Sequence, residues 1–538
     1  MEFEMIAKTF QGLEGVLAEE LRNIGANNVE EGRRMVWFTG DKAVLYKANF
    51  CCRTALRILK PIYKFIASNA DELYEAVKKF EWDTVLKLEQ TFSIDATIYS
   101  DDFRHSRFAT YRVKDAIADF FTEKYGKRPS IRLNNPEVQF NVHIAGNEVT
   151  LSLDSSGQSL HKRGYRVAQT EAPINEVLAA GILKLAGWDG QCNLVDPMCG
   201  SGTFLIEAAL MAANINPGVF RSGFAFENWD DFDAELFESI YDDDSAERDF
   251  NFKIFGSDVS PKAIEIAKRN IKSAGVSKYI DIECKSLQSI DSIAEGEGIM
   301  VTNPPYGERI AVEDMEGLYH DLGERLKRVF KGYKAWVIGY KTEYFDCVGL
   351  KPSVKMPLLN GELECELREY VMFDGKYDDL RRDGGSIKDE DFAKRRSDDK
   401  PYHKRRFEET FKSDRRPRHF DDEDTRERRP RHFKIEDRDE RPRFEKGKKQ
   451  HHDRFDDGRQ PRRADHDKMQ RRERNKRFDE DYENESTTER KFVHSEDFSK
   501  RVVKFREPQL SKDNEVLSNS LRRRGWRKKD AENGGSDE

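Results

Sequence analysis

The stretch that decides the fold is Leu194-Val195-Asp196-Pro197-Met198-Cys199-Gly200-Ser201-Gly202-Thr203. An apolar strand ends at Asp196, the chain turns through two glycines, and a helix follows. Gly200 and Gly202 allow a ligand to lie against bare backbone, and the unpaired N–H groups at the helix start attract an anionic group. A dinucleotide site would carry a third glycine where this chain has Leu205, so the pattern disfavours a pyrophosphate ligand.

Asp196 instead suits a ligand that carries an ammonium group. S-adenosylmethionine has no phosphate, but it needs room for a carboxylate, an acceptor for its ammonium group and an acid for its ribose. The strand Ile254–Asp258 ends in such an acid. The alternatives are a tight turn without a ligand, and an ordinary acid ahead of a helix N-cap at Ser260.

The spacing between these two motifs is unusually long. In nucleotide-binding folds the ribose acid lies about 20 residues beyond the glycines, whereas Asp258 lies much further along the chain. The excess is Pro217–Phe250, which is acidic and rich in aromatic residues. We interpret this stretch as an insertion on the rim of the sheet.

A third motif, Asn303-Pro304-Pro305-Tyr306-Gly307-Glu308-Arg309, directly follows the apolar strand 299–302. The two prolines stiffen the loop, so it can present the Asn303 side-chain oxygen and the Pro304 carbonyl as paired acceptors for a base amino group. Tyr306 can stack on the base, which is worth about 1–3 kcal/mol. Such a site works by positioning and electrostatics and needs no strong general base. A Pro-Pro turn can also be merely structural, but three motifs in this order, each after a strand, favour a ligand site.

Residues 156–378 alternate between strands and helices on the scale of long βα units. The clearest helix is 261–274, with Ser260 at its N-cap, Pro261 in its first turn and Gly275 after its end. This pattern predicts an α/β fold, an open and mostly parallel Rossmann-like sheet with helices on both faces. Residues 1–155 show shorter units and a hairpin around Gly146-Asn147, which predict an α+β region.

The C-terminal part, residues 379–538, predicts a disordered, charged tail. Residues 1–380 contain 45 Lys and Arg against 61 Asp and Glu, whereas residues 381–538 contain 48 against 40. The tail has few aliphatic residues, so it cannot bury enough apolar area to offset chain entropy of about 1–2 kcal/mol per residue. The chain therefore combines an acidic body with a basic tail.

The seven cysteines include no C-x-x-C pair, so they predict neither a disulfide framework nor a zinc site. We expect reduced thiols, no metal and a cytoplasmic location. The N-terminus shows no secretory signal, and no apolar run approaches 18 residues, so no membrane span is expected.

The first and third motifs together resemble the class I methyltransferases that act on exocyclic amino groups. From residue 1 to about residue 375, the chain resembles the THUMP-domain large-subunit rRNA guanine-N2 methyltransferases, in particular the N-terminal half of the fused enterobacterial enzyme. The stretches that support this wider resemblance are Leu160–Arg166, Ala172–Glu176 and Leu358–Cys365. The resemblance implies a ferredoxin-like part (1–43), a THUMP domain (44–155) and a methyltransferase domain (156–378).

The resemblance also implies the cofactor S-adenosylmethionine and roles for individual residues. Ser286 stands where the family usually has an acid for the adenine amino group, so cofactor affinity could be weaker here. The implied catalytic residues, which hold the guanine, are Asn303, Pro304 and Tyr306. The implied cofactor-binding residues are Asp196, Pro197, Gly200, Gly202, Thr203, Asp258, Ser286 and Asn303.

Two basic clusters are candidates for RNA contact, since Lys and Arg supply salt-dependent affinity for phosphates. The first contains Arg104, Arg107 and Arg112, and the second contains Lys162, Arg163 and Arg166. The alternative for both is a solvated, charged face.

The expected function is the formation of N2-methylguanosine in large-subunit (23S) rRNA before the subunit is fully assembled. A tRNA guanine methyltransferase is the closest alternative. A non-catalytic RNA-binding assembly factor and a DNA or protein amino methylase are two others, because an Asn-Pro-Pro-Tyr motif alone also fits the adenine N6 atom.

Overall fold

The computed structural model describes residues 2–103, 106–294, 296–305, 314–340, 342–361 and 363–373. The expected tail, Arg104 and Tyr306 lie outside these described residues. Within them, two β-sheets organise the chain.

The first sheet has the strand order β2-β3-β1-β4-β8-β7-β5-β6. Its strands are β1 (Phe3–Lys8), β2 (Asn27–Gly32), β3 (Met35–Gly40), β4 (Arg57–Ile66), β5 (Thr91–Tyr99), β6 (Ser130–Ile131), β7 (Val138–Ala145) and β8 (Glu148–Asp154). The hairpin expected around Gly146-Asn147 is present, with Ala145 opposite Glu148 and a left-handed φ of 62° at Gly146.

Strand β4 joins the two N-terminal units, because one end pairs with β1 and the rest pairs with β8. The helices of this region are α1 (Glu14–Asn23), α2 (Lys42–Cys51), α3 (Ala70–Lys78) and α4 (Ser106–Tyr125). Helix α2 packs into the same core as β1 and β3, whereas α3 and α4 cover β5 and β7. The boundary expected after residue 43 therefore falls inside α2.

The second sheet has the order β11-β10-β9-β12-β13-β15-β14. Its strands are β9 (Asn193–Asp196), β10 (Ile254–Asp258), β11 (Ile280–Cys284), β12 (Gly298–Thr302), β13 (Tyr333–Gly339), β14 (Val354–Asn360) and β15 (Leu363–Val371). The pairings from β11 to β13 are parallel, and β15 and β14 are antiparallel. Strand β9 lies between β10 and β12, so the strand order reverses there, and a ligand site is expected at its carboxyl end.

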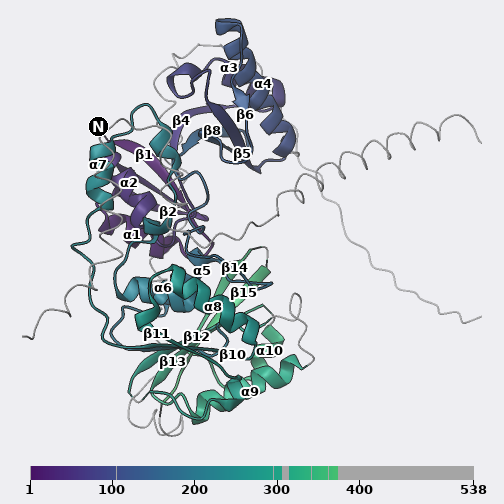
Figure 1. Ribbon diagram of the computed structural model, residues 1–538. Helices are drawn as coiled ribbons and strands as arrows, with labels where there is room; N and C mark the ends of the chain where they lie inside the picture. The colour runs from purple at the N-terminus through teal and green to yellow at the C-terminus, as the bar shows by residue number, and fades with distance from the viewer. Residues whose placement is uncertain are drawn as a thin grey trace, which may run out of the picture. The chain divides into compact units, whose positions relative to one another are not determined.

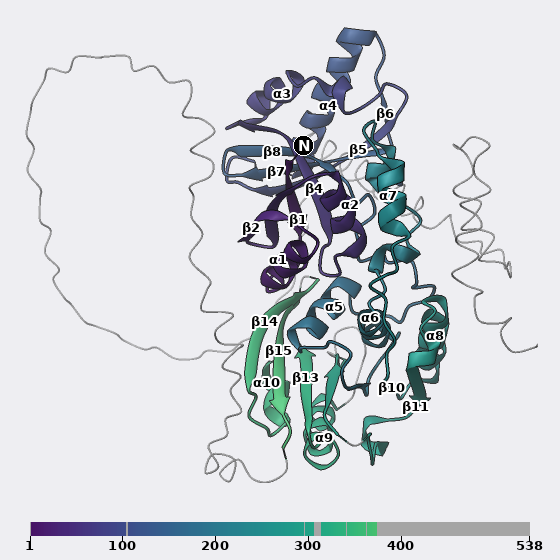
Figure 2. The ribbon, with the colours of Figure 1, turned by 90° about the vertical axis from the view of Figure 1, so that its left-hand side faces the viewer.

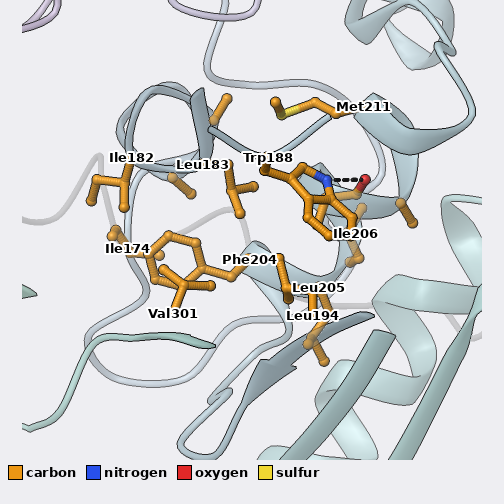
Figure 3. Packing of buried hydrophobic residues seen from close by; sticks show 14 of the residues in the cluster. Ile174, Ile182, Leu183, Trp188, Leu194, Phe204, Leu205, Ile206, Met211 and Val301 are labelled. Atoms are coloured by element: carbon orange, nitrogen blue, oxygen red, sulfur yellow. Dashed lines mark hydrogen bonds between the residues drawn. The ribbon is translucent and has the colours of Figure 1, made fainter. Parts of the chain in front are cut away.

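Helices cover both faces of this sheet, which confirms the predicted α/β architecture (Figure 1). One face carries α5 (Glu176–Leu185), α6 (Thr203–Ala212) and α8 (Pro261–Ser273), and the other carries α9 (Met315–Arg328) and α10 (Thr342–Cys347). Figure 3 shows the core on the first face, where Phe204 and Leu205 of α6 lie near Leu194 of β9. The Trp188 indole in this core donates a hydrogen bond to the Ala208 carbonyl at 3.0 Å.

Most of the insertion Pro217–Phe250 packs away from the rim of the second sheet, so that prediction is wrong, although its last residue, Phe250, contacts Trp188 in the core of this sheet. The insertion holds α7 (Ala234–Tyr241), which packs against α2 in the N-terminal core (Figure 2). The Tyr46 and Phe226 rings stack with centroids 4.5 Å apart. The aromatic residues of the insertion thus complete the hydrophobic core formed by β1, β3 and α2 near the start of the chain. Short 3₁₀ helices span Pro217–Phe220 and Ala225–Asn228 within the insertion, and Trp82–Thr84, Ser277–Tyr279 and Leu287–Ser289 in other described parts of the chain.

This packing makes a stability prediction. Phe226 is fully buried between the rings of Tyr46, Phe224 and Phe237. Replacing Phe226 with alanine should cost about 3–5 kcal/mol of unfolding free energy, because it removes a large side chain and leaves a cavity. Chemical denaturation of the full chain measures the loss. The exposed Phe252, replaced with alanine, is the control and should change stability by less than about 1 kcal/mol.

Candidate active site

The turn after β9 uses its two glycines differently. Both adopt a left-handed φ, 52° at Gly200 and 80° at Gly202. A Cβ atom on Gly200 would meet only the Thr170 hydroxyl, at 4.0 Å, so this backbone is open to a ligand. A Cβ atom on Gly202 would lie 3.2 Å from the Ala267 Cβ of α8. Gly202 therefore brings two helices together and does not line the cavity, contrary to the sequence prediction.

A cavity of about 540 Å³ opens at the carboxyl ends of β9, β10 and β12. It brings together the other described residues that the sequence predicted for the cofactor and the base. These residues are Asp196, Pro197, Gly200, Thr203, Asp258, Ser286, Asn303 and Pro304. The Asn303-Pro304 loop and the glycine turn thus face the same space.

Asp196 is the most strongly perturbed acid of this cavity. Its Oδ1 atom accepts hydrogen bonds from the Met198 backbone N–H at 3.2 Å and the Thr302 hydroxyl at 2.9 Å. Within the described chain, no donor reaches Oδ2. Burial raises the pKa of Asp196 to about 7, and the nearby Asp258 carboxylate adds to the rise. A buried carboxyl group with one unused oxygen is a fitting partner for a ligand ammonium group.

Asp258 holds the turn together. Its Oδ2 atom accepts a hydrogen bond from the Gly200 backbone N–H at 2.9 Å, and its Oδ1 atom accepts one from the Ser260 N–H at the same distance. The alternative reading, an acid at the start of α8, therefore describes part of its geometry. Each carboxylate oxygen has a second acceptor site, so Asp258 can still receive ribose hydroxyls.

The loop after β12 is linked to the acid through one residue. Thr302 ends β12, is fully buried and donates its hydroxyl hydrogen bond to Asp196. Asn303 follows directly, half-buried at the cavity wall, and Pro304 is buried behind it. Thr302 therefore fixes the position of the Asn303-Pro304 loop relative to the Asp196 carboxyl group.

Sequence reasoning missed several residues of the cavity. Val259 is 72% exposed at the cavity rim, where its side chain offers an apolar surface to a flat ring. Its place directly after Asp258 could have revealed it. The wall formed by residues 169–174 has no such signal, because this segment belongs to none of the three motifs and reaches the cavity only through the fold.

The two basic clusters separate into exposed and internal residues. Arg107 and Lys162 are exposed and available to a phosphate. Arg112 is partly buried: it forms an ion pair with Asp71 at 2.7 Å, and its guanidinium lies 4.6 Å from the centre of the Tyr74 ring. It holds α4 against α3.

Arg163 and Arg166 do not support the RNA contacts predicted for them. Arg163 is 2% exposed and donates to the carbonyls of Leu160 and Arg53, so no phosphate can reach it. The Arg166 guanidinium donates hydrogen bonds to internal partners, among them the Glu176 carboxylate at 2.6 Å. Charge can be read from the sequence, but these buried partners cannot.

No group of three or more potential metal ligands occurs in the part of the chain that the structure describes. Among the described helices, none is both long enough and apolar enough to cross a bilayer.

Three family models match the chain in order. They are the RlmL ferredoxin-like domain at residues 4–59, the THUMP domain at residues 67–154 and the RMKL-like methyltransferase domain at residues 163–369.

Two similar relatives come from bacteria. A Synechocystis protein named "Putative RNA methyltransferase slr0064" is 40% identical over 370 residues, which cover 68% of this chain and 96% of the relative. The ribosomal RNA large subunit methyltransferase K/L of Syntrophotalea carbinolica is 38% identical and covers 68% of this chain. The match spans only 53% of that relative, so this chain corresponds to about half of a K/L protein.

Solved structures agree with this assignment. The crystal structure of SMU.472, described as a "putative methyltransferase complexed with SAH", matches 70% of this chain and 99% of its own length, with 30% identity and a TM-score of 0.62. A "predicted N6-adenine-specific DNA methylase" from Listeria monocytogenes matches 69% of this chain and 97% of its own length, with 31% identity and a TM-score of 0.62.

The matched domains, their order and the near-complete alignment to the Synechocystis relative confirm the resemblance read from the motifs. The chain belongs to the family of RMKL-like methyltransferases that carry an RlmL ferredoxin-like domain and a THUMP domain.

Proposed function

We propose that this protein uses S-adenosylmethionine to methylate the exocyclic N2 amino group of a guanine in large-subunit rRNA. One observation carries the proposal: the Asn303-Pro304 loop and the Asp196 acid line one cavity and are joined through Thr302. The K/L relatives are named as methyltransferases of the same rRNA.

The cavity fits S-adenosylmethionine group by group. Asp196 offers Oδ2 to the ammonium group, Asp258 offers its free acceptor sites to the ribose hydroxyls, and the open backbone at Gly200 leaves room beside them. Val259 offers an apolar surface to the adenine, and Ser286, which also lines the cavity, is the residue that the resemblance assigns to the adenine amino group. When bound, the cofactor supplies an electrophilic methyl group.

The protein's part in the reaction is to orient the guanine. The Asn303 side-chain oxygen and the Pro304 carbonyl accept hydrogen bonds from the amino group, which favours a more tetrahedral and more nucleophilic nitrogen. The stiff loop keeps both acceptors in place before the reaction, so little reorganisation is needed. The proton that the amino group loses passes to water. Tyr306, outside the described residues, is proposed to stack on the base.

RNA binding is proposed to extend from the cavity to the exposed Lys162 and to Arg107 in the THUMP domain. Because the described body is acidic overall, local basic residues matter more for capturing RNA. The target base must turn out of its stack to reach the cavity, so we propose that the substrate is rRNA before full subunit assembly, in the cytoplasm.

The rival functions make different predictions for one measurement. Mass spectrometry of nucleosides from a deletion strain should show the loss of one N2-methylguanosine from large-subunit rRNA. Loss from tRNA alone would assign the protein to tRNA, and loss of methyladenine from DNA would assign it to DNA. If no modified nucleoside changes while ribosome assembly fails, the protein is a non-catalytic assembly factor.

Cofactor affinity should depend on pH because of Asp196. Its carboxyl group has a pKa of about 7 in the folded protein and must be ionised to hold the ammonium group. As the pH falls below 7, the affinity for the cofactor should fall by up to about tenfold per pH unit. Binding should release protons in this range, because the Asp196 carboxyl group must lose its proton to bind the ammonium group. Calorimetry with S-adenosylhomocysteine at pH 5.5, 6.5 and 8 measures this. Equal affinity at all three pH values would contradict the assignment of Asp196.

A further inference from the structure

We propose that Arg166 and Asn270 are positioning residues that hold the cofactor-binding turn in place by bonding it to the segment that leaves the N-terminal half. The inference goes beyond the proposed function and rests on only one part of it, the use of S-adenosylmethionine. It does not depend on which nucleic acid is methylated.

Arg166 connects three pieces of chain with one guanidinium group. Its Nη1 atom donates to the Ser201 hydroxyl and its Nη2 atom to the Thr203 hydroxyl, both at 2.9 Å, so two arms of the fork hold the glycine turn. Its Nε atom donates to Glu176 at 2.6 Å, and Nη2 also reaches the Ile174 carbonyl at 3.2 Å. The start of α5 and the turn are thereby fixed to each other.

Asn270 of α8 makes the same connection from the other side. It is 1% exposed. Its side-chain oxygen accepts from the backbone N–H groups of Val167 and Ala168 at 3.0 and 3.1 Å. Its amide nitrogen donates to the carbonyls of Ala168 and Ser201 at 2.9 and 3.1 Å. The amide is thus fully used to join residues 167–168 to the turn.

These bonds matter for the cavity because both of their ends form its walls. The segment 169–174 begins directly after the residues that Asn270 holds, and it lines the cavity. Ser201 and Thr203 line the cavity as well. If the bonds were lost, the two walls could move relative to each other, and a ligand lying against the Gly200 backbone would lose a fixed site. A lysine cannot replace the fork, since its single ammonium head cannot reach all four partners of the planar guanidinium group.

Arg221 provides a matched control. It is another largely internal arginine that holds the same connecting segment, through the carbonyls of Ser156, Gln158, Ser159 and Lys162. It contacts neither the glycine turn nor the cavity lining. A change at Arg221 should therefore loosen the segment without moving the turn.

The test compares the full-length wild type with Arg166→Lys, Arg166→Ala, Asn270→Ala and Arg221→Ala. Calorimetry gives the Kd for S-adenosylhomocysteine, filter binding gives the Kd for rRNA, and thermal unfolding gives stability. We expect about tenfold weaker cofactor binding for Arg166→Lys, more for Arg166→Ala and about tenfold for Asn270→Ala, each with rRNA affinity within twofold of wild type. Arg221→Ala should lower the unfolding temperature and leave the cofactor Kd within twofold.

A double substitution makes the test specific. Adding Ser201→Ala to Arg166→Lys should weaken cofactor binding by less than twofold further, because the bond between these residues is already gone. The inference is overturned if Arg166→Lys folds and binds S-adenosylhomocysteine like wild type, or if Arg221→Ala weakens that binding as much as Arg166→Lys does. Failure of the wild type itself to bind S-adenosylhomocysteine would instead refute the proposed cofactor.

Discussion

Replacing Asn303 with alanine is expected to reduce methyl transfer by about a thousandfold or more while rRNA binding stays within twofold. The alanine removes one of the two acceptors that orient the amino group, and removal of one such pre-positioned polar group costs about 10²–10³ in rate in well-studied enzymes. The base is also held less firmly in its reactive orientation, which lowers the rate further. The proposed phosphate contacts at Lys162 and Arg107 are unchanged in this variant, so rRNA affinity should change little.

The measurement is transfer of a labelled methyl group to unmodified rRNA under single-turnover conditions, with filter binding in parallel. Asn303→Asp is the matched variant, because it keeps an acceptor oxygen in the same place, while it replaces the amide donor with a second, negatively charged acceptor. It should retain at least about ten times the rate of the alanine variant. If the alanine variant keeps more than a tenth of wild-type activity, Asn303 does not orient the base.

Replacing Asp196 with asparagine should abolish detectable cofactor binding and, at the same time, stabilise the ligand-free protein. Within the described chain, Oδ1 accepts both hydrogen bonds of this side chain, from the Met198 N–H and from the Thr302 hydroxyl, and an asparagine oxygen can keep them. The amide nitrogen would then occupy the position of Oδ2 and repel the ammonium group. Loss of a buried charged partner of this kind is worth about 3–5 kcal/mol, which is more than a hundredfold in Kd.

The gain in stability follows from the direction of the pKa shift. Folding raises the pKa of Asp196 from 3.8 to about 7, so the folded state binds the proton more tightly than the unfolded chain. The stabilisation of the folded state by the protonated carboxyl group is fully present below pH 4 and is lost as the pH rises to 7. At pH 8 the unfolding free energy is therefore lower by on the order of 4 kcal/mol than it is at low pH. The asparagine variant avoids that cost. Its unfolding temperature should exceed that of wild type at pH 8 and approach it at low pH; a lower value at pH 8 would contradict the role of Asp196.

The sequence predicted the catalytic domain well where local signals agree with one another. Helix α8 was expected over 261–274 and spans Pro261–Ser273, with the Ser260 side chain accepting from the Ala263 N–H as an N-cap should. The strands that end at Asp196, Asp258 and Thr302 lie side by side in the sheet, so the three motifs meet in one cavity. Periodicity, capping and the order of the motifs were sufficient for this part.

The errors have a common physical cause, since burial depends on partners far along the chain. Arg163 looks like a surface residue until Glu207, 44 residues away, lies beside it. Gly202 looks like Gly200 until α8 packs against it through Ala267. From the sequence, the Pro217–Phe250 insertion resembles an addition to the rim of the sheet, but in the fold its phenylalanines pack against Tyr46 and Phe50. None of these encounters leaves a local pattern in the sequence.

The pairing of β4 with both β1 and β8 limits how the protein can be dissected. A fragment cut at the start of the matched THUMP region would lose this strand and leave the backbone N–H and C=O groups of β8 exposed to neighbouring molecules. Unprotected strand borders of this kind promote aggregation. The ferredoxin-like and THUMP regions have separate hydrophobic cores. Because they share β4, they should be expressed together as a single fragment.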